Sequence, residues 1–424
     1  MPENRRFRQT WKEHVCHSGL KVIVIEKKGF STSGAMLITP YGSLDYIQED
    51  SSGREYASPL GTAHFLEHKL FESEDNDVTR QFSQIGANVN AFTSYSETAY
   101  YFTTGESHVE KPLNMLLDFV QNFAVTDASV EKERPIILEE YQMYQEDPDG
   151  RLFQESMRGL YHCHPIREDI VGTEASISAI TRQDLEAAYA RNYHPGAMTL
   201  VILSAADAEE LIETVEKNQS GKQFPHQEKY VRKNWQEDLI PEQLCIETVM
   251  DVQSQKTAYS FKLNSAGMTA AQRLEMEWGI RFALDSWFTP MNPLFQTWLD
   301  EERITPYFST DTDSAQDYAY LQIMDETAKA DELREFILRQ LNALCEKGIS
   351  EEHVSQLKRR TIGSNIRLFD YPSELMNAWA RSTVTNVSLF DEIDVIEHLT
   401  ADRCMEILRS LDLSNPACAK LVSR

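Results

Sequence analysis

Apolar positions along the chain follow two periods, and these divide the first half into strands and helices. Mostly apolar runs predict strands at 18–25, 33–44 and 198–204, and alternating or aromatic-rich runs predict strands at 90–94 and 98–103. Segments with helical spacing are expected at 110–123, 129–146 and 184–193. Pro135 leaves the start of the helix at 129–146 open. The turn-forming residues 147–150 end that helix.

The second half of the chain repeats the order of elements in the first half. A polar segment at 221–238, which contains Gly221 and Pro225, is the predicted linker. Strands at 245–249 and 257–261 and a helix at 269–288 follow it, in the order expected from a tandem duplication. The length of 424 residues also exceeds one ordinary core. We therefore predict an α+β fold of two homologous αβ domains, 1–220 and 239–424, each an antiparallel-rich sheet packed by helices.

A short helix after the polar loop at 48–59 carries the chemistry-bearing motif. His64 and His68 are four residues apart, so on a helix they share one face and can hold one metal ion. Glu67 lies on that face too, and as a carboxylate beside the metal it can deprotonate a water. The order is H-x-x-E-H, the reverse of the commoner zinc helix. Apolar neighbours predict that this helix packs into the core, where polar side chains need partners. The helix at 269–288 has no histidine, so only the first domain is expected to carry a metal.

A catalytic zinc needs a third protein ligand beyond two histidines. The helix at 129–146 offers Glu133, Glu139 and Glu140, and spacing alone leaves the choice open. Glu133 and Glu140 share a helix face, being two turns apart, whereas Glu139 points elsewhere. Three other histidines stand in loops beside prolines, and we expect structural roles for them: His162, His164 and His194.

Composition narrows the class of partner and the compartment. The net charge of −26 argues against nucleic acid and anionic membrane as partners, because both need basic surface. Cationic peptides fit this charge, although solubility alone explains it. No secretory h-region and no run of eighteen apolar residues is present, so no membrane span is expected. The six cysteines contain no C-x-x-C pair, which predicts a reducing, cytoplasmic location: Cys16, Cys163, Cys245, Cys345, Cys404 and Cys418.

Several motifs together resemble one peptidase family. The stretches 61–68 and 86–93 are similar to the insulinase/pitrilysin family of inverted zincins, and so is the pair Glu133 and Glu140. His164-Pro165, 172–174 and 193–195 also fit. The chain looks most like the half-length bacterial branch related to mitochondrial processing peptidase, which includes the YmfH-like peptidases. The match is close in the first half and loose in the second.

This resemblance implies a metal centre and a substrate strand. His64, His68 and Glu140 would bind Zn²⁺, with Glu133 supporting the site from behind these ligands and Glu67 acting as the base. The edge strand after the metal helix would bind a peptide substrate by strand addition. In this chain that edge includes Asn90, Ala91, Phe92 and Thr93.

The resemblance also implies an activity and an assembly. The expected function is that of a zinc metalloendopeptidase cleaving peptides or unfolded segments, and the alternative is a non-catalytic assembly or peptide-binding subunit. Family members enclose substrate between two clam-like halves, which in chains of this length are usually two subunits.

One departure from the family bears on that assembly. Active members carry an arginine seven residues before a tyrosine in the second domain, to hold the substrate and stabilise the oxyanion. Tyr307 matches the tyrosine, but Asp300 stands in place of the arginine, and Arg303 has a different spacing. The expectation is therefore a heterodimer, in which a homologous subunit without metal supplies the arginine and tyrosine.

Overall fold

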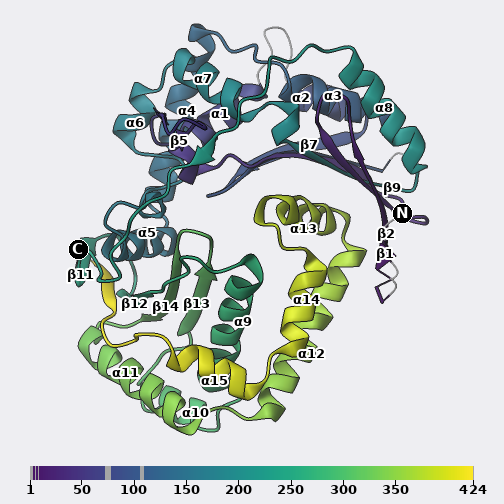
Figure 1. The fold of residues 1–424 in the computed structure, drawn as a ribbon. Coiled ribbons are helices and arrows are strands. Elements are labelled where there is room, and N and C mark those ends of the chain that lie inside the picture. The colour runs from purple at the N-terminus through teal and green to yellow at the C-terminus, as the bar shows by residue number, and fades with distance from the viewer. Residues whose placement is uncertain (1–2, 5, 8, 72–77, 106–108, 424) are drawn as a thin grey trace. The chain divides into compact units, whose positions relative to one another are not determined.

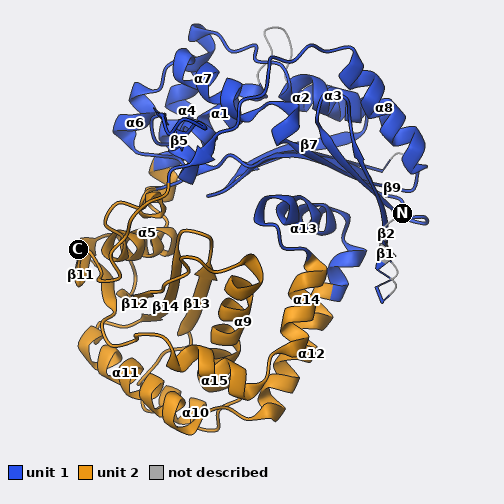
Figure 2. Ribbon diagram, viewed as in Figure 1, with its two compact units in different colours: residues 1–141, 169–233, 366–388 blue, residues 142–168, 234–365, 389–424 orange. Residues whose placement is uncertain are grey.

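The structure of the chain is a computed structural model that describes residues 3–4, 6–7, 9–71, 78–105 and 109–423 (Figure 1). The described residues form two compact units (Figure 2). The first unit comprises 1–141, 169–233 and 366–388, and the second comprises 142–168, 234–365 and 389–424. Each unit is therefore discontinuous in sequence. The division at 1–220, 221–238 and 239–424 stays a prediction about the two halves of the sequence.

A seven-stranded sheet forms the centre of the first unit. Its order is β1-β2-β3-β9-β4-β8-β7, in which only β3 and β9 are parallel. The central strands are nearly continuous apolar runs because helices cover both faces of the sheet (Figure 1). The strands are β1 (Glu3–Asn4), β2 (Gln9–Val15), β3 (Lys21–Glu26), β4 (Ser33–Thr39), β7 (Ala87–Thr93), β8 (Thr98–Thr104) and β9 (Thr199–Ser204). A small sheet accompanies them, in the order β10 (Val231–Arg232), β5 (Ile47–Glu49) and β6 (Glu55–Ala57).

Helices α1, α3 and α8 pack on one face of this sheet, and α13 packs on the other face against β4 and β9 (Figure 1). The approach of α13 is close, since a Cβ added to Gly34 of β4 would lie 2.8 Å from Cε of Met376. The helices of the unit are α1 (Thr62–Leu70), α2 (Val78–Gln84), α3 (Glu110–Val120), most of α4 (Asp127–Gln145), α6 (Glu174–Ala179), α7 (Arg182–Asn192), α8 (Ala208–Ser220) and α13 (Pro372–Thr385).

The second unit is built around a five-stranded sheet in the order β11-β15-β12-β14-β13. Only β11 and β15 are parallel. The strands are β11 (Cys245–Val249), β12 (Lys256–Lys262), β13 (Ser309–Ser314), β14 (Ala319–Glu326) and β15 (Ala417–Val422). The helices are α5 (Pro148–Leu160), α9 (Ala270–Trp287), α10 (Phe295–Asp300), α11 (Ala330–Lys347), α12 (Glu351–Arg367), α14 (Leu389–His398) and α15 (Ala401–Arg409).

The two sheets share one topology. The order β3-β9-β4-β8-β7 of the first unit corresponds strand for strand to β11-β15-β12-β14-β13, with the single parallel pair in the same place. Helix α13 covers β4 and β9, and α5 covers their counterparts β12 and β15. Each of these helices comes from the other half of the sequence. The predicted fold of two homologous αβ domains, each with an antiparallel-rich sheet packed by helices, is confirmed.

One predicted strand is longer than the observed one, and the start of one predicted helix, which Pro135 left open, is now fixed. The strand expected at 33–44 ends at Thr39, because Pro40 has no N–H for the ladder and a 3₁₀ turn at Ser43–Tyr46 follows. The helix at 129–146 begins before Pro135, which lies inside α4. Within the described part of the chain, no helix is both long and apolar enough to cross a membrane.

The end of the predicted linker is fixed to the second unit by a buried ion pair. Glu237 accepts hydrogen bonds from Nζ of Lys262 at 2.6 Å and from the backbone N–H groups of His162, Cys163 and His164 at 3.0, 2.7 and 2.6 Å. The side chain of Lys262 is only 3% exposed. Burial opposes the charge on Glu237, but Lys262 and the N–H groups outweigh it and lower the pKa of Glu237 to about 2. This segment is therefore anchored where composition predicted a polar connection.

The Glu237→Gln variant should be destabilised by about 3–5 kcal/mol, because it leaves Lys262 buried without its counter-charge. A folded pKa of about 2 lies below the ordinary 4.5, so the stabilisation is complete above pH 4.5 and is lost as the pH falls toward 2. Thermal unfolding of both proteins across this range should show their difference shrinking with acid. The control is Asp238→Asn at the exposed neighbouring position, which should unfold like the wild type. If Glu237→Gln were as stable as the wild type, the ion pair would have no stabilising role.

Candidate metal centre

Two glycines determine where helix α1, which carries the H-x-x-E-H motif, begins. Gly61, with a φ of +84°, caps its N-terminus, and a Cβ there would lie 2.1 Å from the carbonyl oxygen of Val171. Gly172, with a φ of +96°, faces it, and its Cβ would lie 2.7 Å from the carbonyl oxygen of Leu60. Two backbones touch here, and both positions favour a residue without a side chain. The helix that follows is therefore held at its first turn by the loop before α6.

Helix α1 presents three candidate side chains together. One nitrogen of His64, one of His68 and one carboxylate oxygen of Glu67 all lie within 4.8 Å of one another. The two imidazole rings are 4.7 Å apart between centroids. The same helix buries Phe65 and Leu66 completely, and this packing fixes the orientation of its polar face.

Helix α4 brings two glutamates to these histidines. Oε1 of Glu140 lies 3.7 Å from Nε2 of His64, and Oε2 lies 3.3 Å from Nε2 of His68. Glu133 contacts the other nitrogen of His68, with Oε1 at 3.1 Å from Nδ1. Glu139 is exposed, one position away on the helix. The structure thus gathers His64, His68 and Glu140 around one point and places Glu133 behind His68.

Two basic residues that the sequence did not indicate hold α4 in place. Nζ of Lys69 lies 3.6 Å from Oε2 of Glu133 and donates to the carbonyl oxygen of Ser129 at 3.0 Å, with its side chain fully buried. Arg134 donates to the carbonyl oxygens of Ile177 and Ile180 in and after α6. No sequence signal distinguishes Lys69, because a lysine on a helix usually faces water.

The electrostatics of the centre follow from these contacts. Burial raises the pKa of Glu67, although the two histidines oppose this. Burial disfavours a charge on His68 as well, but hydrogen bonds to Glu133 and Glu140 raise its pKa to about 10. Hydrogen bonds from His64 and His68 hold the pKa of Glu140 far below its usual range. In the absence of metal, these contacts favour a protonated His68 beside an ionised Glu140. A metal ion bound here would displace the proton of the histidine.

The predicted substrate strand lies beside this centre. Asn90, Ala91, Phe92 and Thr93 belong to β7, the last strand of the seven-stranded sheet. Oγ1 of Thr93 lies 3.3 Å from Oε2 of Glu67 and donates to it. This contact was not expected from the sequence, and it links the strand edge directly to the candidate base.

The remaining candidate residues lie in the second unit or in turns. Tyr307 precedes β13 in the second unit and is 67% exposed, and Asp300 and Arg303 nearby are exposed too. His164 and His194 each cap a short 3₁₀ turn that starts with proline, with Nδ1 accepting from the backbone N–H two residues later. These two histidines have the structural positions that their loop contexts predicted.

Comparison with known proteins places the chain in a family. The family profile Insulinase (Peptidase family M16) matches residues 51–174, and the profile Peptidase M16 inactive domain matches residues 179–361. The chain is 33% identical over 408 residues to an uncharacterized zinc protease, YmfH, of Bacillus subtilis, covering 96% of this chain and 95% of that protein. The chain belongs to the insulinase family, peptidase family M16. The resemblance inferred from the motifs is confirmed.

Other relatives agree with this membership. A protein from Arabidopsis thaliana, named as the beta subunit of mitochondrial-processing peptidase, is 31% identical over 161 residues, 37% of this chain and 30% of its own length. A crystal structure of an M16-like peptidase from Alicyclobacillus acidocaldarius superposes with a TM-score of 0.90 at 30% identity, covering 98% of this chain and 99% of that one. Several relatives carry the name zinc protease.

The donor set of the centre fits zinc. Imidazole nitrogens and carboxylate oxygens bind zinc at about 2.0–2.2 Å, so two donors of one tetrahedral ion lie roughly 3.3–3.6 Å apart. The separation of 3.3 Å between Glu140 and His68 lies in this range, and that of 3.7 Å between Glu140 and His64 lies just beyond it. Glu133 lies 3.1 Å from Nδ1 of His68, a position in which metal-bound histidines commonly have a carboxylate partner.

Replacing Glu140 should remove the metal, whereas replacing its neighbour should not. We expect Glu140→Gln to lose most bound zinc by metal analysis, because a neutral amide is a weaker ligand than a carboxylate. Glu139→Gln, on the exposed side of α4, is the matched control and should retain a full equivalent. The reverse result would move the third ligand by one residue.

Proposed function

We propose that the chain is a zinc-dependent metalloendopeptidase that cleaves peptides or unfolded segments. The observation that supports this best is the convergence of His64, His68 and Glu140, with Glu67 beside them. Zinc held there would lower the pKa of its water toward about 7 and polarise the scissile carbonyl. The names of the relatives support the same chemistry.

Glu67 is proposed as the general base and acid. Its carboxylate lies among the ligand atoms but is not needed as a ligand, so it can accept a proton from the attacking water. Burial raises its pKa, which favours return of that proton to the leaving amine. The hydroxyl of Thr93 donates to Oε2 and leaves Oε1 for the water.

Glu133 is proposed as a positioning residue. Its contact with Nδ1 of His68 fixes the ring so that Nε2 faces Glu140. Lys69 holds the other oxygen of Glu133, which keeps this carboxylate from turning toward the metal. The glutamates of α4 thus have separate tasks: Glu140 as ligand and Glu133 as support.

Strand β7 is proposed to bind substrate. It ends the seven-stranded sheet, and no further strand among the described residues pairs with its outer side, where a peptide strand could be added. Thr93 at its end touches Glu67, and an extended peptide paired with residues 90–93 would therefore pass the candidate base. Main-chain pairing of this kind favours unfolded segments over folded proteins.

The Glu67→Gln variant should keep its zinc but lose cleavage by roughly 10²–10⁴-fold, the usual contribution of a general base. Turnover of a quenched fluorescent peptide, measured together with zinc content, checks this. Glu139→Gln, which makes the same change at an exposed position, should cleave normally. Cleavage at the wild-type rate by Glu67→Gln would show that another group acts as base.

We further propose that the active form is a heterodimer with a homologous subunit that lacks metal. An acidic Asp300 stands where an arginine would stabilise a developing oxyanion, and an acid there opposes that charge. The profile matched by residues 179–361 is described as an inactive domain, and one relative is named as a subunit. Both facts support a chain that provides the metal half of a larger site.

The purified single chain should therefore bind zinc but cleave peptides poorly, and adding the homologous subunit should raise its turnover. Turnover measured with and without that subunit, at equal zinc content, tests this. If the chain alone is fully active, and Tyr307→Phe and Arg303→Ala both impair it, then it completes its own site and needs no partner. Lys347→Ala, a substitution elsewhere in the second unit, controls for general damage.

A further inference from the structure

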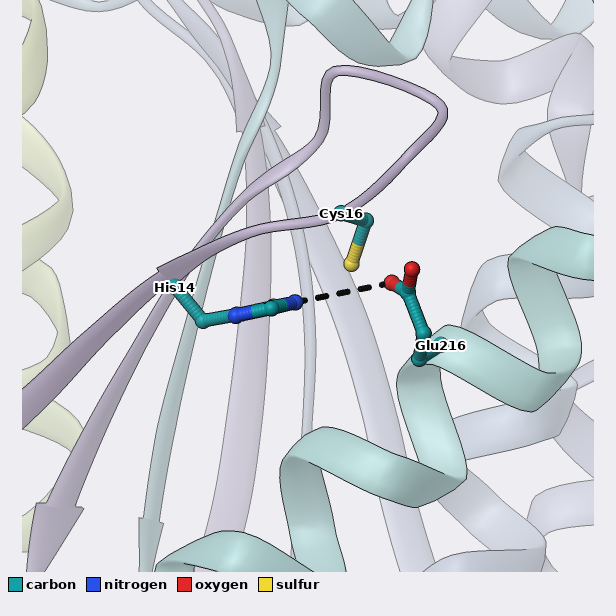
Figure 3. A group of neighbouring side chains, drawn as sticks. All are labelled: His14, Cys16 and Glu216. Carbon is teal, nitrogen blue, oxygen red and sulfur yellow. Dashed lines mark ion pairs between the residues drawn. The ribbon is translucent and has the colours of Figure 1, made fainter.

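A second cluster of metal-type ligands lies near the other edge of the seven-stranded sheet. His14 at the end of β2, Cys16 in the following turn and Glu216 on α8 point toward one another (Figure 3). One ligand atom of each lies within 4.8 Å of the others, and the ligand atoms of His64, Glu67 and His68 lie within the same limit. Strand β2 is next to the β1 edge, whereas β7 beside α1 is the opposite edge.

The two oxygens of Glu216 have different surroundings. Oε1 accepts from the backbone N–H of His17 at 3.1 Å and lies 3.2 Å from its Nδ1. Oε2 faces Nε2 of His14 at 3.6 Å, which is too long for a hydrogen bond. Both of these facing atoms are buried and make no hydrogen bond of ordinary geometry among the described residues, but the thiol of Cys16 lies near enough to Glu216 to act as a weak donor to its carboxylate. Nε2 of His14 is therefore the atom that faces this point without a partner, which is uncommon for a buried polar atom.

The donor types and spacing suit a transition metal. A thiolate, an imidazole and a carboxylate are all zinc ligands, and sulfur selects zinc-like ions over magnesium or calcium. The separation of 3.6 Å between His14 and Glu216 equals the expected distance between two donors of one tetrahedral ion. His17 on Oε1 resembles the outer hydrogen bond that orients a ligating carboxylate.

The simpler interpretation is an ordinary buried cysteine beside a surface ion pair, since free cysteine is often buried. That interpretation explains the 3% exposure of Cys16. It leaves unexplained why Nε2 of His14 is buried 3.6 Å from Oε2 of Glu216 without a hydrogen bond of its own. A cation between them and the sulfur satisfies both.

We propose that His14, Cys16 and Glu216 form a second metal site for a thiophilic divalent cation such as Zn²⁺. The site joins the turn after β2 to helix α8, which are about two hundred residues apart in the sequence. Three protein ligands leave one position for water, and the side chains of His14 and Glu216 are 37% and 35% exposed, so the ion can enter. The bound ion would fix the end of β2 to helix α8, and this role is separate from that of the centre on α1.

Cobalt substitution can separate the two sites, because only the second contains sulfur. In Glu140→Gln, with the first site weakened, apoprotein should bind one equivalent of Co²⁺ that survives dialysis and shows a thiolate-to-cobalt charge-transfer band. Wild type should bind two equivalents with one such band. Cys16→Ser should lose the band, and so should His14→Gln at equimolar cobalt, which serves if the serine variant does not fold.

The control is Cys163→Ser, which removes an exposed thiol that lies outside the cluster and should leave the band intact. Two results would overturn the proposal: wild type that binds one equivalent without a thiolate band, or a band that persists in both Cys16→Ser and His14→Gln. Neither result depends on peptide cleavage, so failure here is distinguishable from failure of the proposed activity.

Discussion

The first unit depends on a polar contact between two helices that would ordinarily meet through apolar side chains. Helix α1 presents two histidines and a buried lysine, and two carboxylates of α4 contact them. Such groups are costly to bury unless each has a partner of opposite charge. These pairs form only when the two helices are correctly placed. The Gly61–Gly172 contact fixes α1, and Arg134 fixes α4. Precise placement of the helices is thus a condition of stability as well as of chemistry.

The residues around the candidate ligands orient the carboxylates of the centre. Lys69 occupies one oxygen of Glu133, so only the other reaches His68. Thr93 occupies one oxygen of Glu67 in the same way. Each carboxylate therefore has a single direction in which it can act. The arrangement at Glu216 has the same form, with His17 on one oxygen and the cluster on the other.

The sequence could predict what depends on local spacing and could not predict what depends on distant segments meeting. Helical periodicity alone puts His64 and His68 on one face, and apolar runs located the central strands. The choice between Glu139 and Glu140 needed either a resemblance or the packing of α4. Lys69 had no signal, because its partner lies sixty residues away. The composition of the two units could not be predicted for the same reason. Residues 142–168 pack in the second unit and residues 366–388 in the first, whereas the segments that flank them in sequence belong to the other unit.

The exchange of α5 and α13 has a consequence for how this chain can be divided. Each sheet has one face covered by a helix that belongs, in sequence, to the opposite repeat. A cut between residues 221 and 238 would separate the repeats but would leave β4 and β9 without α13, and β12 and β15 without α5. Each fragment would expose the apolar face of its strands unless the two fragments reassociated. Each half of the sequence therefore supplies a helix that the sheet of the other half needs, and neither half alone contains all the segments of one unit.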